Sequence, residues 1–81
     1  MTIIQLDMPG CGTCAMMSRM LGDRVEHALA SDRPDLLALT NATSSPVFLV
    51  YEGGQYLGSF SGAMPLSVWE AKVQQRVKGE A

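Results

Sequence analysis

The sequence predicts one small α/β domain, spanning residues 1–81, whose elements follow the order β-α-β-β-β-α. Three observations support this fold class: a β-rich run that leads into a helix, a later strand hairpin, and a final run of apolar residues at helical spacing. A chain of 81 residues can bury roughly 60–65% of its unfolded surface, which is enough for one hydrophobic core.

The composition excludes several classes of protein. Hydrophobic residues make up 47% and charged residues 17% of the chain, which is typical of a globular domain rather than a disordered one. Six scattered Lys and Arg do not form the basic stripe that a nucleic-acid partner requires. The apolar runs are far shorter than the ~20 residues of a membrane span, and the N-terminus does not resemble a signal peptide. We therefore expect a cytoplasmic protein without nucleic-acid or membrane partners.

The first half of the chain predicts a strand and then a helix. Residues 2–6 are β-rich, and the segment Asp7–Gly10 is a loop signal. Five apolar or small residues then recur three or four positions apart, which is typical of one face of a helix: Cys14, Met17, Leu21, Val25 and Ala28. Gly22 interrupts this helix, so one kinked helix and two short helices both remain open. Pro34 ends the helical region.

The second half predicts three strands and a closing helix. The apolar run Leu36–Thr40 is interpreted as the second strand. Val47–Tyr51 is the clearest strand of the chain, and a turn at Glu52–Gln55 joins it to a returning strand, Tyr56–Phe60. Pro65 suits the first turn of the last helix. The expected buried stripe of that helix consists of Leu66, Trp69, Val73 and Val77.

Cys11 and Cys14 are the only two cysteines of the chain, and they lie where the first strand leads into the helix. An exposed cysteine pair at such a position is typical of thiol–disulfide exchange. Cys11 would lie at the helix N-terminus, where backbone N–H groups and the helix dipole favour a thiolate, so we expect it to be the attacking thiol. Cys14, one helical turn further on, would be the resolving thiol. A bond between the two would close a very short loop and add little stability.

Two stretches of the sequence resemble the thioredoxin superfamily, and together they cover nearly the whole chain. The first is the unit of strand, loop, Cys-Gly-Thr-Cys run at residues 11–14, and helix. The second is residues 45–54 followed by Ser-Gly-Ala at 61–63, which is similar to the family's cis-proline, hairpin and glycine ahead of the last helix. Residues 60–65 also resemble, in part, the Trp-Ser-Gly-Phe-Arg-Pro run of the NrdH-type redoxins that serve ribonucleotide reductase.

This resemblance implies a protein-disulfide oxidoreductase that acts as a dithiol electron donor and needs no cofactor. Its partners would be a disulfide-containing client protein, with ribonucleotide reductase as a candidate, and a reductase as the source of electrons. We expect Pro46 to be cis and to pack against the cysteine pair, Ser45 to offer its backbone to an extended client segment, and Gly62 to let the client backbone approach closely. Gly12 and Thr13, between the cysteines, complete the predicted substrate-binding set.

The sequence departs from the family at the cysteines. Gly10 stands where thioredoxins have Trp, and Thr13 stands where the family has Pro or Tyr. Gln5 takes the place of the buried Asp that thioredoxins keep behind the cysteines. The acid–base assistance that this Asp implies is therefore not carried over intact.

The chain also lacks, or much shortens, the helix that relatives place before the cis-proline, because only residues 41–45 separate Leu36–Thr40 from Pro46. Five residues reach up to roughly 17 Å and the crossing needs roughly 10 Å, so a direct connection is feasible. We therefore predict a minimal, two-layer version of the thioredoxin-like fold with a four-stranded mixed sheet. Its uncovered face would expose apolar side chains such as Phe48 and Val50, or the residues that alternate with them along the strand.

Two other functions stay open for this sequence: a non-catalytic adaptor with the redoxin fold, and a metal- or iron–sulfur-binding redoxin dimer. Two Cys and one His are too few for the four ligands that a zinc or iron–sulfur centre needs within one chain. We interpret His27 as an ordinary helical residue and Asp7 as a solvated loop acid. The methionines of the first helix are interpreted as core filler: Met16, Met17 and Met20.

Overall fold

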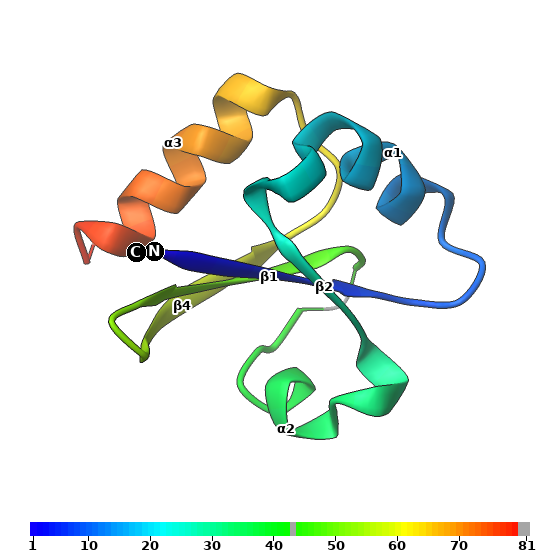
Figure 1. The fold of residues 1–81 in the computed structure, drawn as a ribbon, viewed down its shortest axis with the longest axis horizontal. Coiled ribbons are helices and arrows are strands. Elements are labelled where there is room, and N and C mark those ends of the chain that lie inside the picture. The colour runs from blue at the N-terminus through cyan, green and yellow to red at the C-terminus, as the bar shows by residue number, and fades with distance from the viewer. Residues whose placement is uncertain (43, 80–81) are drawn as a thin grey trace.

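The computed structural model describes residues 1–42 and 44–79, which form a four-stranded sheet with helices on both faces (Figure 1). The strands are β1 (Thr2–Asp7), β2 (Glu26–Leu29), β3 (Val47–Glu52) and β4 (Gln55–Ser61). The helices are α1 (Gly12–Leu21), α2 (Pro34–Leu37) and α3 (Leu66–Val77), with the 3₁₀ turns η1 (Gly22–Arg24) and η2 (Ala30–Asp32). Within the described residues, no helix has both the length and the apolar character needed to cross a membrane.

The sheet has the strand order β2-β1-β3-β4 and is mixed. β1 runs parallel to β2 and antiparallel to β3, and β3 runs antiparallel to β4. Parallel neighbours need a crossover connection, which α1 provides between β1 and β2. Gly53 and Gly54 form the β3–β4 turn with φ values of 57° and 82°, as a tight hairpin requires. The predicted four-stranded mixed sheet and its hairpin are confirmed.

The predictions for the second strand and for the end of the first helix are wrong. α1 ends at Leu21 because Gly22 adopts a φ of 57°, and the Gly22 N–H bonds back to the Ser18 carbonyl. The chain then enters β2 at Glu26, so His27 lies in a strand rather than in a helix. β2 is an edge strand whose side chains are mostly exposed, and its conformation depends on pairing with β1. Such pairing overrides the helical spacing that the local sequence shows.

The segment predicted as the second strand, Leu36–Thr40, is helical at its beginning instead. α2 covers Pro34–Leu37, and Pro34 occupies its first turn, where a missing N–H costs nothing. The Ala38 N–H continues this turn by bonding to the Pro34 carbonyl at 3.0 Å. α2 is therefore the much shortened helix between the second strand and Pro46 that the predicted fold class allowed.

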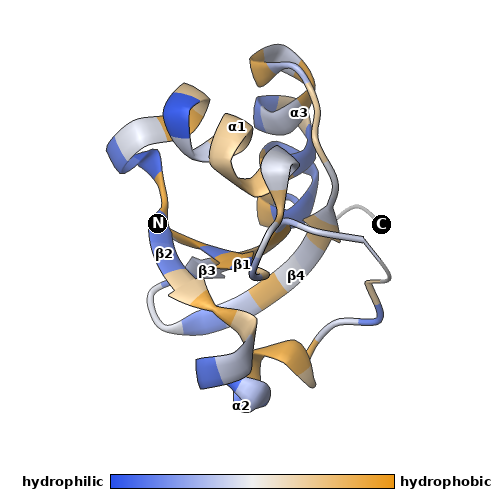
Figure 2. Cartoon of the chain, turned by 90° about the vertical axis from the view of Figure 1, so that its right-hand side faces the viewer, coloured by the Kyte–Doolittle hydropathy of each residue, from blue (hydrophilic) through white to orange (hydrophobic). Residues whose placement is uncertain are grey.

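The prediction of a two-layer domain with one bare sheet face is also wrong. Figure 2 shows α1 and α3 on one side of the sheet and α2 on the other. Leu36 of α2 packs in a small cluster with Leu6, Val47 and Leu49. Phe48 and Val50, expected to be exposed, are 0% exposed and face α1 and α3. Both faces of β3 are thus buried, because its alternating side chains enter two separate clusters.

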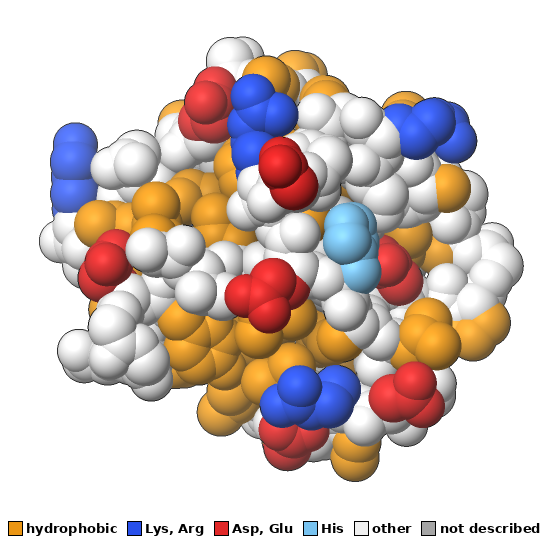
Figure 3. Space-filling model, viewed as in Figure 1, with side chains coloured by type: hydrophobic (Ala, Val, Ile, Leu, Met, Phe, Trp, Pro, Cys, Tyr) orange, Lys and Arg blue, Asp and Glu red, His pale blue; other side chains and the backbone are white. Residues whose placement is uncertain are grey.

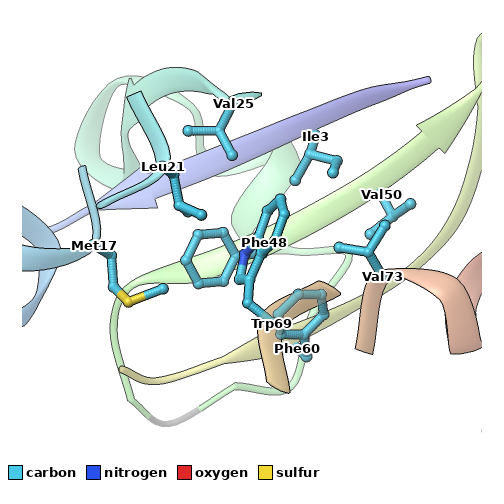
Figure 4. Close-up of a cluster of buried hydrophobic side chains, with 9 residues drawn as sticks. All are labelled: Ile3, Met17, Leu21, Val25, Phe48, Val50, Phe60, Trp69 and Val73. Carbon is cyan, nitrogen blue, oxygen red and sulfur yellow. The ribbon is translucent and has the colours of Figure 1, made fainter. Parts of the chain in front are cut away.

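The main core lies between the sheet and the two longer helices (Figure 4). It consists of Ile3, Met17, Leu21, Val25, Phe48, Val50, Phe60, Trp69 and Val73. The ring of Phe48 lies 5.2 Å from that of Phe60 and meets the edge of Trp69 at 5.9 Å between centroids. Of the stripe predicted for α3, Trp69 and Val73 are buried, whereas Val77 is exposed. The aromatic cluster therefore fixes α3 against β3 and β4, and Met17 and Leu21 bring α1 into the same core.

Candidate functional site

Cys11 and Cys14 form a disulfide at the beginning of α1. Cys11 is the N-cap residue of the helix, and its Sγ accepts a hydrogen bond from the Cys14 backbone N–H at 3.1 Å. Cys11 is partly exposed, whereas Cys14 is only 4% exposed. The two cysteines are therefore unequal, because solvent reaches the residue Cys11 more readily than the residue Cys14. The predicted division into an attacking and a resolving thiol needs this inequality.

Two hydroxyl groups flank the sulfur of Cys11. Thr13 Oγ1 and Ser45 Oγ each lie 3.3 Å from the Cys11 Sγ. The Thr13 hydroxyl also donates a hydrogen bond to the Ser45 backbone carbonyl at 3.2 Å. The turn that holds the cysteines is thus tied to the loop that precedes β3, and both hydroxyl-bearing residues belong to the predicted site.

The Ser45–Pro46 peptide bond is cis, which confirms the predicted conformation of Pro46. The buried Pro46 accepts a hydrogen bond at its carbonyl from the Gly62 N–H at 2.9 Å. Gly62 has a φ of 102°, and a Cβ built there would meet only Ser44 Oγ, at 4.0 Å. The backbone conformation rather than crowding therefore requires glycine at this position. Gly12 is exposed, and a Cβ there would meet nothing within 4 Å.

Gln5 lies behind the cysteines, and its side chain is 0% exposed. Its Nε2 is 3.1 Å from the Cys14 carbonyl, 3.0 Å from the Ser18 hydroxyl and 2.7 Å from Asp7 Oδ1. A carbonyl and a carboxylate can only accept, so the amide nitrogen must face them, and Gln5 Oε1 has no partner among the described residues. A neutral amide does not take up a proton at neutral pH. Gln5 can therefore hold α1 in place but cannot serve as the base that an Asp would provide.

A chain of polar contacts links this buried amide to the surface. Asp7, interpreted as a solvated loop acid, is instead the last residue of β1 and is partly buried. Its carboxylate accepts the Gln5 hydrogen bond and lies 3.8 Å from His27 Nδ1 on β2. Figure 3 shows the one histidine at the surface beside an acidic side chain. These contacts were not predicted from the sequence, because His27 was placed in a helix. The alternation of Ile3, Gln5 and Asp7 along β1 was nevertheless a signal that Gln5 and Asp7 lie on the same face of the strand.

An apolar groove lies between α1 and the segment that follows Gly62. It is lined by Met16, Met17, Met20, Ala63, Met64 and Pro65. Met17 is fully buried, so its interpretation as core filler is confirmed, whereas Met16 is 46% exposed and that interpretation is wrong for it. Thioether side chains are flexible and adapt to different apolar partners. The groove therefore adds an apolar surface near the residues expected to contact a client.

The described residues contain no group of three or more His, Cys, Asp or Glu side chains that could hold a metal ion. A zinc ion or an iron–sulfur cluster on Cys11 and Cys14 would therefore need ligands from a second chain or from added thiols.

The chain has the thioredoxin fold, with a cysteine pair at the beginning of α1 and a cis-proline loop against it. Among solved structures, it is similar to mitochondrial thioredoxin 3 from Saccharomyces cerevisiae in its oxidized form. The two share 24% sequence identity with a TM-score of 0.67, over 91% of this chain and 76% of that one. No protein-family model matches the sequence, and the comparison with curated proteins likewise finds no match. The predicted fold is confirmed, and the NrdH-type subclass stays a prediction.

Proposed function

We propose that this chain is a protein-disulfide oxidoreductase, a dithiol electron donor whose exchange centre is the pair Cys11 and Cys14. The observation that carries the proposal is the unequal exposure of the two cysteine residues at the beginning of α1. An accessible sulfur that receives a backbone N–H hydrogen bond and two hydroxyl contacts can exist as a thiolate after reduction. A buried sulfur one turn away can then complete the exchange.

The reaction follows from this arrangement. The Cys11 thiolate attacks one sulfur of a client disulfide, so that a mixed disulfide forms and the other client sulfur leaves as a thiolate. Cys14 then loses its proton and attacks the Cys11 sulfur, which breaks the mixed disulfide. The client takes up two electrons and two protons in total, and the Cys11–Cys14 disulfide remains. A reductase that carries a dithiol then reduces the Cys11–Cys14 disulfide by the same two exchange steps, and its own dithiol becomes a disulfide.

The other predicted site residues would bind the client. An extended client segment would pair with the Ser45 backbone beside Pro46, as an added strand pairs with a sheet edge. Gly62, which lacks a side chain, would leave room for that segment, and Gly12 and Thr13 would contact it from α1. The partial likeness of residues 60–65 to the NrdH-type run supports ribonucleotide reductase as the client, in the cytosol.

The test is reduction of insulin disulfides with dithiothreitol as the source of electrons. Wild-type protein should accelerate the reaction, and Cys11→Ser and Cys14→Ser should each reduce that acceleration to the background rate. A serine-to-alanine variant at an exposed position outside the predicted site, Ser31→Ala, provides the control. If the wild type were no faster than the cysteine variants, the chain would act as an adaptor rather than as a reductase.

A trapping experiment tests the roles of the two sulfurs. Cys14→Ser should retain a client as a stable mixed disulfide on Cys11, because the resolving thiol is absent. Cys11→Ser should trap much less, since Cys14 is buried. Incubation with ribonucleotide reductase as the bait tests the proposed client, and metal analysis of the purified wild type tests the metal-binding alternative.

A further inference from the structure

The hydroxyl of Thr13 has two partners but only one proton. It donates to the Ser45 carbonyl at 3.2 Å, and its oxygen lies 3.3 Å from the Cys11 Sγ. A hydroxyl can donate to one acceptor at a time. A disulfide sulfur is uncharged and accepts weakly, so in the oxidised pair the proton belongs to the carbonyl.

Reduction changes which acceptor is stronger. When a dithiol donor reduces the Cys11–Cys14 bond, the donor becomes a disulfide and supplies two electrons and two protons. Cys14 keeps one proton, and Cys11 releases the other to solvent when it becomes a thiolate. A hydrogen bond to an ionised acceptor is roughly twice as strong as one between neutral groups. The Thr13 proton stays on its own oxygen throughout, but its preferred acceptor becomes the Cys11 sulfur.

We propose that Thr13 is a redox-linked hydrogen-bond switch that covers the Ser45 carbonyl when the cysteines are oxidised and exposes it when they are reduced. The proposal rests on the function proposed above, in which the Ser45 backbone pairs with the client. In the reduced protein, the freed carbonyl accepts a client backbone N–H while Thr13 stabilises the attacking thiolate. After exchange, Thr13 returns to the carbonyl and competes with the client. Binding is therefore strongest in the redox state that can react.

The Cys11 sulfur has two hydroxyl neighbours, whereas the Ser45 carbonyl depends on Thr13 for its side-chain hydrogen bond. The Ser45 hydroxyl also lies 3.3 Å from the Cys11 Sγ, so the thiolate keeps one hydroxyl contact whichever way Thr13 points. The Ser45 carbonyl, by contrast, receives its side-chain hydrogen bond from Thr13. Loss of the Thr13 hydroxyl should therefore remove one of the two hydroxyl contacts that stabilise the Cys11 thiolate. It should also abolish the dependence of the Ser45 carbonyl's hydrogen bond on the redox state of the cysteines.

The switch can be observed directly at the Ser45 carbonyl. Ser45–Pro46 is the only Ser–Pro step in the sequence, so labelling serine with ¹³C at the carbonyl and proline with ¹⁵N identifies this one resonance through its coupling. In the wild type, the resonance should move upfield on reduction with dithiothreitol, as a carbonyl does when it loses a hydrogen bond. In Thr13→Val, which removes the hydroxyl but keeps the shape, it should lie near the reduced position in both states.

Two further variants separate the switch from general disturbance. Thr13→Ser should restore the redox-dependent movement, and Thr2→Val, the same substitution at an exposed position of β1, should leave it unchanged. Alkylation of reduced Cys11 by iodoacetamide at neutral pH should slow roughly threefold in Thr13→Val and recover in Thr13→Ser, because one thiolate contact is lost.

The proposal is overturned if the wild-type resonance is the same in both redox states, or if Thr13→Val keeps the full movement. These outcomes differ from failure of the proposed function, which would appear as loss of insulin reduction in the wild type. If the Ser45 resonance moved with redox state but the wild type did not reduce insulin, the hydrogen-bond switch would stand and the proposed reductase function would be wrong.

Discussion

The two faces of the sheet carry very different amounts of packing. α1 and α3 cover one face and enclose the main core, which includes the aromatic cluster of Phe48, Phe60 and Trp69. On the other face, α2 contributes Leu36 to a cluster of four residues. The helix that begins at the cysteines lies on the heavily packed face. The short α2 therefore covers the second face with few contacts, whereas the position of the disulfide depends on the main core.

The largest expected effect comes from the heavily packed face. Phe48→Ala should lower the free energy of unfolding by about 3–5 kcal/mol, because it removes the ring that contacts both other aromatic side chains. Denaturant unfolding of the oxidised protein measures this, with Phe48→Leu as a milder variant if the alanine variant does not fold. Val68→Ala, at an exposed position of α3, should change little. Equal losses in the two alanine variants would contradict the assignment of the core.

The thinly packed face should show a smaller loss. Leu36→Ala should cost about 2–3 kcal/mol, since Leu36 is buried but lies on a helix of one turn that can partly collapse. The matched control is Leu39→Ala, because Leu39 is 47% exposed. The same unfolding experiment should rank Leu36 between Phe48 and Leu39. A loss as large as that of Phe48→Ala would mean that both faces contribute equally.

The buried side-chain amide of Gln5 tests the contribution of a polar group on the heavily packed face. Gln5→Leu should destabilise the protein by about 1–2 kcal/mol, because the Cys14 carbonyl and the Asp7 carboxylate lose a buried donor. Gln55→Leu, at the exposed beginning of β4, is the control. Retention of full stability in Gln5→Leu would show that its hydrogen bonds do not hold α1.

Gly62 tests backbone conformation instead of packing. Gly62→Ala should cost about 1 kcal/mol, because its φ of 102° is rarely adopted by residues with a side chain. Gly12→Ala should be neutral or slightly stabilising, since Gly12 begins a helix and nothing lies within 4 Å of its Cβ position. Calorimetric melting of both variants measures the contrast, and an unchanged Gly62→Ala would argue for a different local backbone.

The smallest effect on stability is expected from an exposed ion pair between Arg33, which precedes α2, and Asp35, in the first turn of α2. The hydrogen bond from Arg33 lowers the pKa of Asp35 from its ordinary value of 3.8. A carboxyl whose pKa is lowered by folding stabilises the protein above its ordinary pKa, and this contribution disappears as pH falls through the lowered value. Asp35→Asn should thus differ slightly from the wild type near pH 7 and not at all in strong acid, with the difference reduced by salt. Unfolding of Asp32→Asn across the same pH range provides the control, and a salt-independent difference would contradict the surface pairing.

The elements that could be predicted from the sequence are those that depend mainly on neighbouring residues in the chain. The β-rich run before Cys11, the glycine turn between β3 and β4, and the apolar stripe around Trp69 are local patterns, and each formed the predicted element. The resemblance carried by residues 11–14 and 45–54 supplied the cis conformation of Pro46, which the structure confirms. Local hydrophobic periodicity indicates which secondary structure a short segment favours, and each of these segments favours one type strongly.

The remaining features depend on contacts between segments that are distant in the sequence. Glu26–Leu29 shows helical spacing in sequence, yet it becomes a strand because β1 offers it a partner. Leu36–Thr40 is apolar enough for a strand, but it packs as a turn of helix on the second face of the sheet. The contacts of Gln5 with α1 and of Thr13 with Ser45 join segments far apart in the chain. A local pattern can place Gln5 on one face of β1, but it does not name the partners, because these contacts form only after the sheet has brought both segments together.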